Sequence, residues 1–127
     1  MALGSPSAIS LYIGGFMSVQ IIRGTTPHIT CRISGDLTQA HLFFSVGPKR
    51  RHSWFTVEHG QISVSYDKGA DVTIAEFTLT QRQTCACNAG KAYAQFRAVD
   101  NTGNGMVSNR TEIEIVDIIK DGVIAYA

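Results

Sequence analysis

Apolar and polar residues alternate most regularly in the segment 91–100, where Ala or Phe occupies every second position from 92 to 98. Successive side chains of a β-strand point to opposite faces, so this pattern predicts a strand with one buried face. After a turn at 101–105, the segment 106–117 repeats the alternation, with Ile113 and Ile115 on its apolar side. The two segments predict an antiparallel hairpin, and the rest of the chain must cover its apolar face because a lone hairpin is barely stable.

Shorter strand-like segments precede this hairpin and are separated by Gly, Pro and Asp, which are typical of turns. They lie at 19–23, 28–34, 40–46, 54–57, 61–66 and 72–79. The stretch 80–88 is expected to form a helical turn, with Thr80 as its N-cap. The pattern predicts an all-β fold, namely an immunoglobulin-like antiparallel sandwich of about seven strands with a short helical connector.

Cys31, Trp54 and Cys87 follow one another in the order typical of immunoglobulin domains, but their spacing differs. Trp54 lies too far along the chain, and Cys87 precedes the strand that would carry the second cysteine. We therefore expect a sandwich without the disulfide between its sheets. The chain has 3 Cys at uneven spacing, which favours free thiols in a reducing compartment. Cys31 alternates with Ile29 and Ile33 in an apolar row, so we expect its thiol to be buried.

The composition suits a single domain with one core, because 44% of the 127 residues are hydrophobic and 17% are charged. We place this domain at 17–127 and treat 1–16 as an N-terminal extension or arm. The net charge of +1 gives no broad electrostatic field. This balance argues against nucleic acid or an anionic membrane as the partner.

The apolar run 8–16 follows no basic residue and is too short to cross a bilayer, so it makes a poor signal peptide or anchor. Two interpretations of residues 1–16 remain open. Met17 can be the more natural start, which would make 1–16 an upstream extension. Alternatively, Ile9, Leu11 and Ile13 alternate with polar or amphipathic neighbours as an added edge strand would.

Two flanks, 7–16 and 123–127, lie outside the sandwich pattern and carry almost no charge. Flanks of this kind can add a strand to another chain, because main-chain pairing gives affinity without a charged surface. The alternative is that they fold back on their own sheet or lack order. The residues predicted to contact another copy or a different protein are Ile9, Leu11, Ile13, Val123, Ile124 and Tyr126.

Candidate chemistry is sparse in this sequence. Cys85 and Cys87, with four histidines elsewhere, provide the ligand types of a zinc site, but such sites usually need a second close pair. Ordinary thiols on a connector are the preferred interpretation. The scattered histidines also indicate no Cys–His nucleophile pair. We therefore expect no catalytic residues, no metal and no cofactor.

A short basic run at 49–52 stands next to Trp54 and Phe55. Cationic and aromatic side chains together can neutralise and stack on a bound strand of nucleic acid. The run is short, so a solvated loop tip beside core aromatics is the preferred interpretation. The candidate ligand-binding residues here are Arg50, Arg51 and Trp54.

Several motifs together resemble a known group of proteins. They are IIRGTTP at 21–27, LTQ at 79–81, GK at 90–91, RAVD at 97–100 and IVDIIKDGVI at 115–124. The chain resembles, over about residues 19–124, small β-sandwich proteins encoded near the tail and baseplate genes of phages and prophages of Gram-positive bacteria. It is loosely similar to the N-terminal domain of baseplate upper proteins. These motifs mark a fold and include no catalytic residues.

The resemblance implies a non-enzymatic structural role in a phage tail or baseplate, through contacts with other tail proteins or with further copies of itself as a homo-oligomer. It implies residence in the bacterial cytoplasm during assembly and in the virion afterwards. The cysteines at 85 and 87 and the basic loop depart from the family pattern. The alternative is a carbohydrate-binding or host-recognition module, which would be indicated by exposed aromatic residues on one face. The candidates are Trp54, Phe55 and Tyr93.

Overall fold

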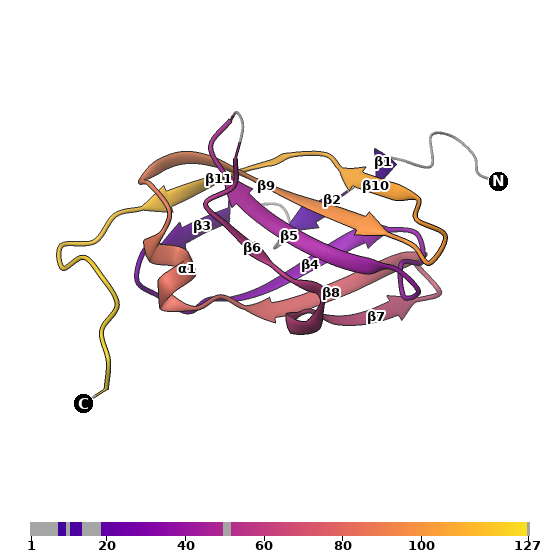
Figure 1. The fold of residues 1–127 in the computed structure, drawn as a ribbon, viewed down its shortest axis with the longest axis horizontal. Coiled ribbons are helices and arrows are strands. Elements are labelled where there is room, and N and C mark those ends of the chain that lie inside the picture. The colour runs from indigo at the N-terminus through magenta and orange to yellow at the C-terminus, as the bar shows by residue number, and fades with distance from the viewer. Residues whose placement is uncertain (1–7, 10, 14–18, 50–51, 127) are drawn as a thin grey trace.

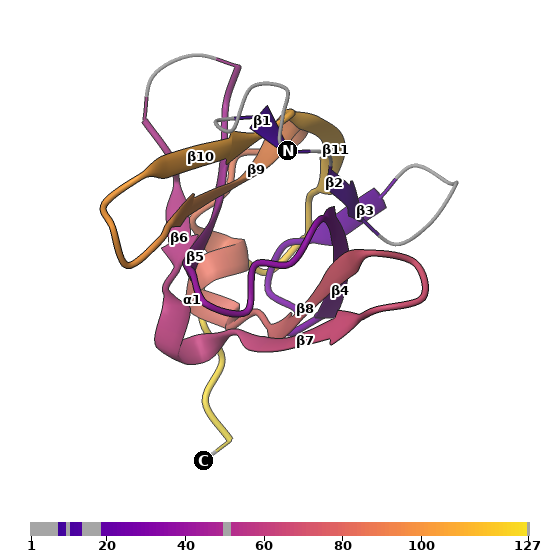
Figure 2. The same ribbon diagram turned by 90° about the vertical axis from the view of Figure 1, so that its right-hand side faces the viewer.

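Two β-sheets pack against each other in the computed structural model, which describes residues 8–9, 11–13, 19–49 and 52–126 (Figure 1). Viewed after a 90° turn, β4, β7 and β8 form one layer and β9 and β10 lie in the other (Figure 2). The expected fold class, an immunoglobulin-like sandwich with a short helical connector, is confirmed. Eleven strands occur in the described ranges, more than the expected seven or so, because several are short pieces.

The large sheet has seven strands in the described ranges, with β9 at its centre. Strand β5 pairs with one edge of β9, and β10 and β11 share the other edge. All pairings in it are antiparallel except those of β1 with β10 and of β3 with β11. Its strands are β1 (Ala8–Ile9), β3 (Val19–Ile22), β5 (His41–Gly47), β6 (Phe55–Val57), β9 (Gly90–Val99), β10 (Gly105–Ser108) and β11 (Thr111–Val116).

The small sheet has four strands in the order β2-β4-β8-β7, all antiparallel. This order corresponds to the ABED sheet of an immunoglobulin domain, and β6, β5, β9 and the pair β10–β11 correspond to the opposing sheet. Two short helices lie in the connections. The remaining elements are β2 (Leu11–Ile13), β4 (His28–Ser34), β7 (Ser63–Asp67), β8 (Val72–Thr78), the 3-10 helix η1 (His59–Gln61) and the helix α1 (Gln81–Cys85).

The expected hairpin exists, but its return segment is not the single strand predicted over 106–117. It breaks between β10 and β11 at Asn109 and Arg110. The buried Ser108 explains the break, because its hydroxyl accepts the Phe96 N–H (2.9 Å) and donates to the Asn109 carbonyl (2.9 Å). The Ser108 side chain thus replaces one backbone hydrogen bond between the strands. The alternation of apolar residues continues on both sides of the break, so the sequence pattern did not predict it.

Three phenylalanines join the sheets at the centre of the core. Phe44 of β5 and Phe96 of β9 face Phe77 of β8, with ring centroids 4.7 Å apart for Phe44–Phe77 and 5.1 Å for Phe44–Phe96. Cys31 on β4 is free and fully buried, as expected from its alternating row. Ala94 and Phe96 occupy the inward positions of β9. Apolar packing therefore takes the place of the disulfide between the sheets.

Helix α1 begins where the sequence predicted it. Thr80 is the N-cap, and its hydroxyl accepts the Gln83 N–H (3.1 Å) while the Gln83 side chain accepts the Thr80 N–H (2.9 Å). This reciprocal capping box satisfies two backbone donors at the helix start. The helix is one short turn between β8 and β9. No helix among the described residues has the length and apolar character needed to cross a membrane.

The N-terminal strands pair within the same chain. Ala8 and Ile9 run parallel to β10 in the large sheet, and Leu11–Ile13 pairs antiparallel with β4 in the small sheet. The chain therefore passes from one sheet to the other between β1 and β2. The prediction that Ile9, Leu11 and Ile13 contact a partner stays a prediction.

Candidate functional site

Arg23 connects three parts of the chain at one end of the sandwich. It follows β3, and its guanidinium donates hydrogen bonds to the carbonyls of Cys87 (2.9 Å) and Cys85 (3.0 Å). The same group contacts the carboxylates of Asp117 (2.7 Å) and Asp121 (2.8 Å). We call these five residues the Arg23 cluster. It attaches the chain that follows β11 to the connector α1 and to the end of β3.

Arg23 and Asp117 each stabilise the charged form of the other. The hydrogen bond from Arg23, followed by that from the Ile118 N–H, lowers the pKa of Asp117 below its ordinary value. The hydrogen bond with Asp117 is in turn the main cause that raises the pKa of Arg23. Both groups therefore stay charged at neutral pH, and the contact persists there.

A second contact holds the C-terminal segment, which we define as residues 118–126. The side-chain amide of Gln81 on α1 donates to the Ile124 carbonyl (3.0 Å) and accepts the Ile124 N–H (2.8 Å). This two-point contact resembles one rung of a β-ladder. The segment leaves the sandwich where α1 and β3 lie (Figure 1).

The loop after β3 packs closely against α1 and against the start of the C-terminal segment. The buried Thr84 hydroxyl accepts the Gly24 N–H (3.0 Å) and donates to the Thr25 carbonyl (2.9 Å). Gly24 has φ +80°, and a Cβ at this position would lie 2.8 Å from the Ile118 side chain. Glycine is therefore favoured by the backbone conformation, and any larger residue would also have to displace the end of the Ile118 side chain.

Large apolar side chains on the C-terminal segment point into solvent. Ile119 and Tyr126 are fully exposed, and Val123 and Ile124 are more than half exposed. Three of these were predicted to contact a partner, but Ile119 was missed. Its neighbour Ile118 is half-buried, and the sequence does not distinguish the two members of an Ile–Ile pair.

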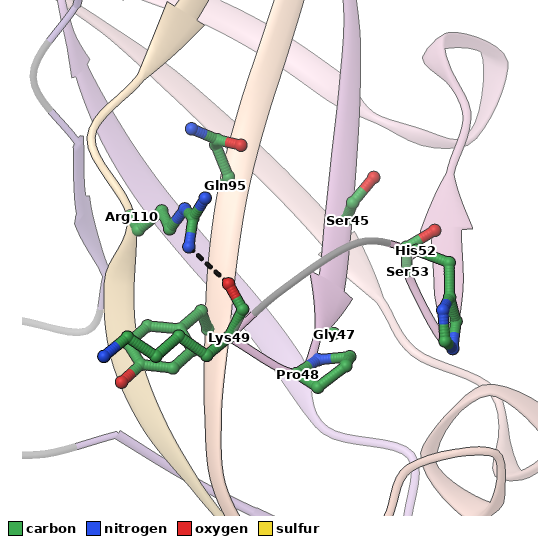
Figure 3. Close-up of a pocket in the computed structure, with 9 residues that line it drawn as sticks. Ser45, Gly47, Pro48, Lys49, His52, Ser53, Gln95 and Arg110 are labelled. Carbon is green, nitrogen blue, oxygen red and sulfur yellow. Dashed lines mark hydrogen bonds between the residues drawn. The ribbon is translucent and has the colours of Figure 1, made fainter.

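A second region of interest is a small pocket on the outer face of the large sheet, the outer-face pocket. Its volume is about 100 Å³. Figure 3 shows Arg110 and Gln95 on one side and His52 and Ser53 on the other. The full lining is Ser45, Gly47, Pro48, Lys49, His52, Ser53, Tyr93, Gln95 and Arg110.

Hydrogen bonds hold the walls of this pocket. Arg110 donates to the Lys49 carbonyl, which ties the loop after β5 to the start of β11 (Figure 3). Gln95 donates to the Ser108 carbonyl (2.8 Å). The hydroxyls of Ser45 and Thr56 lie 2.8 Å apart, which joins β5 to β6.

The residues predicted to bind a ligand fall only partly in this region. Arg50 and Arg51 lie outside the described residues. Trp54 is half-buried against the core and is not among the described residues that line the pocket. Phe55 is buried, so it cannot serve as an exposed aromatic as the carbohydrate alternative supposed. Tyr93 lines the pocket and keeps that role open.

The cysteines and histidines of the described residues do not form a metal-binding cluster. Within the described ranges, no three His, Cys, Asp or Glu residues gather where they could hold a metal ion. Cys85 is half-buried and Cys87 is buried, and both are free. His41 and His59 stack with ring centroids 4.2 Å apart, and His59 accepts the Leu42 N–H (3.2 Å).

Neither a scan against protein-family models nor a search of curated proteins finds a significant match to this chain.

Proposed function

We propose that this protein is a non-enzymatic structural component of a phage or prophage tail or baseplate, and that it binds neighbouring proteins through its C-terminal segment. The observation that carries the proposal is that the segment exposes apolar side chains while its backbone is held in place. Single exposed apolar residues are common on monomers, whereas several on one short segment are typical of an interaction site.

Fixation of the segment favours binding. A free tail loses conformational entropy when it binds, at a cost of about 1–2 kcal/mol for each residue whose backbone becomes fixed. Here the Arg23 cluster and Gln81 already restrict residues on both sides of Val123. A partner therefore meets a largely prepared surface, and more of the contact energy appears as affinity.

The backbone of the segment is also open to pairing. Among residues 119–126, only the N–H groups of Gly122 and Ile124 donate hydrogen bonds. The other N–H groups are available to the edge of a partner's sheet, the mode in which an extended segment adds a strand. A partner with an apolar groove beside a free sheet edge suits this segment best.

The assignment to a tail rests on the resemblance in sequence. Two of the motifs that carry it, 21–27 and 115–124, contain Arg23, Asp117 and Asp121. These are the residues that hold the segment. The resemblance therefore falls on the contacts that the proposed role needs, and this supports the proposal.

The test is to express the chain during phage production in the encoding host, purify the particles on a density gradient and probe them with antiserum. We expect the wild-type protein in intact particles and in isolated tails. Ile119→Asp combined with Tyr126→Asp should remove it from particles while leaving its thermal melt unchanged. The control Val107→Asp, at another exposed apolar residue, should assemble normally. Absence of the wild-type protein from particles would contradict the tail assignment. Normal assembly of the double variant would contradict the role of the segment.

A further inference from the structure

The outer-face pocket contains positive charge without a matching negative charge. Lys49 and Arg110 line it, and none of the nine described lining residues is Asp or Glu. On the neighbouring strand, Glu112 is paired with Lys91 at 3.7 Å and lines a different depression. An anionic group in the pocket would therefore meet attraction and no direct repulsion from its walls.

Donor groups remain available there. Arg110 uses one of its five N–H groups on the Lys49 carbonyl. The Tyr93 hydroxyl, among the described residues, makes no hydrogen bond. Gln95 donates through its amide nitrogen, so its amide oxygen is free to accept. A planar guanidinium with free donors suits a carboxylate, because it can form two parallel hydrogen bonds to it.

The rest of the lining suits a ligand rich in hydroxyl groups. Ser45, Ser53 and Gln95 can each donate and accept, which a ring hydroxyl also does. Tyr93 adds an aromatic ring to the wall. Ser45 and Ser53 each also share a hydrogen bond with Thr56, so the groups left for a ligand are their remaining lone pairs, the Tyr93 hydroxyl and the Gln95 amide oxygen. A lone phosphate or an acidic protein side chain would use the cations but few of these neutral groups.

The pocket itself takes only one charged group and the ring edge beside it, since its volume of about 100 Å³ is below the roughly 300–1,000 Å³ typical of small-molecule pockets. A second depression of about 380 Å³ shares Ser45 and continues on the same sheet face. Phe43, Arg97 and Val99 line it. A longer chain can therefore lie across the sheet, with a second cation along its course.

Gly47 shows that the pocket wall depends on a close approach of backbone. A Cβ at position 47 would lie 2.8 Å from the His52 carbonyl oxygen and 3.0 Å from the Ser53 Cα. Real Cβ atoms do not come this near to backbone atoms, so only glycine lets residues 52 and 53 pack against the end of β5. The substitution of this glycine would move two of the lining residues.

From these observations we propose that the outer-face pocket binds the carboxylate of an acidic sugar, with Arg110 as the main contact and the adjoining depression as the path of an acidic oligosaccharide. The site lies at the far end of β11 from the C-terminal segment. It does not depend on the proposed role of that segment in tail assembly.

The test is a titration of the full chain, labelled with ¹⁵N, followed by the amide shifts of Gly47, Gln95 and Arg110. Glucuronate and glucose are the matched probes, because they differ only at C6, which is a carboxylate in the first and a hydroxymethyl group in the second. We expect saturable shifts with glucuronate and none with glucose. Inorganic phosphate and N-acetylglutamate should bind at least about fivefold more weakly, since they leave the neutral groups unused. Equal binding of either one would overturn the assignment to a sugar, and an absence of shifts with every probe would overturn the site.

Variants locate the binding. Arg110→Gln should weaken glucuronate about tenfold, the usual order for a charge-assisted hydrogen bond to a carboxylate. Arg82→Gln, at an exposed arginine on α1, should leave it unchanged. Gly47→Ala should also weaken binding, whereas Gly60→Ala, where a Cβ meets open space, should not. If Gly47→Ala fails to fold, Arg110→Gln decides the question. Loss of binding in an Arg50→Ala, Arg51→Ala double variant but not in Arg110→Gln would overturn the pocket as the site.

Discussion

Two arginines at opposite ends of β11 use their guanidinium groups in contrasting ways. Arg23, beside the end of the strand, donates four hydrogen bonds inside the chain, and its side chain is 14% exposed. Arg110, just before Thr111, is exposed and donates one hydrogen bond, to the Lys49 carbonyl. The first has little capacity left for a ligand, while the second keeps most of its donors.

The contrast shows how a structural cation differs from a binding cation. Residue type and charge are the same, and both residues adjoin β11. The difference lies in how many donors are satisfied by groups of the same chain. This criterion favours Arg110 for a ligand and Arg23 for the attachment of the C-terminal segment.

The largest effect on stability is expected in the central strand β9. Its two opposite faces also differ, because one is buried in the core and the other is partly exposed. Phe96 is fully buried and contacts Phe44, while Tyr93 is half-buried on the outer face. Phe96→Ala should lower the free energy of unfolding by about 3–5 kcal/mol, as truncation of a packed aromatic does. Tyr93→Ala should cost clearly less. Urea denaturation measures both, and equal losses would mean that the outer face is also covered.

The next effect separates the two arginines directly. Arg23→Ala removes the donors that hold Asp117 and Asp121, so the C-terminal segment should open locally. Trypsin cleavage after Lys120, followed by mass spectrometry, should accelerate about tenfold or more, because local opening exposes the site. Arg110→Ala should leave this rate as in the wild type. A similar rate in both variants would contradict the different roles of the two arginines.

Acid should release the segment before it unfolds the sheets. The pKa of Asp117 is lowered from its ordinary value of 3.8, mainly by Arg23. Its stabilising effect is therefore fully present above that value and is lost as the pH falls below it, through the lowered pKa. In ¹⁵N spectra recorded from pH 6 downward, amides of residues 119–126 should shift before those of β9. In Asp117→Asn the segment should already be loose at pH 6, and an unchanged profile would contradict the mechanism.

The smallest effect concerns the thiols. Burial raises the pKa of Cys31 to about 12, and burial is also the main cause that raises the pKa of Cys87 to about 11. The thiolate is the reactive form, so native protein treated with iodoacetamide should be modified at Cys85 and spared at Cys31 and Cys87. Peptide mapping gives the answer. Rapid modification of Cys31 would show that the face assigned to β4 is wrong.

The sequence predicted those elements that depend on residues close together in the chain. Alternation identified the buried row of β4 around Cys31 and the inward positions of β9 around Phe96, because a strand's faces repeat every two residues. The N-cap of α1 was predicted at Thr80 because N-caps have a strong residue preference, whereas the reciprocal contact of Gln83 was not predicted. The free, buried Cys31 followed from the same alternation.

The contacts of both candidate regions have no such local cause. Arg23 meets residues 62 to 98 positions further along the chain, and no spacing rule connects them. Arg110 lies in the break between β10 and β11, which the continuous alternation of 106–117 concealed. The basic run 49–52 indicated this region of the fold, since its end residues Lys49 and His52 line the pocket. It did not indicate Arg110, which lines the side opposite His52 (Figure 3).

Because the N-terminal strands belong to different sheets, they protect one edge of each sheet. β1 covers the outer edge of β10, and β2 covers the outer edge of β4. A chain shortened to begin at Met17 would leave both edges open at once, and open edges seek strands from other molecules. Such a shortened form should self-associate at concentrations where the full chain does not. Two copies of the full chain can also satisfy the same edges by trading these strands, which makes exchange of the N-terminal arm a natural route to a dimer.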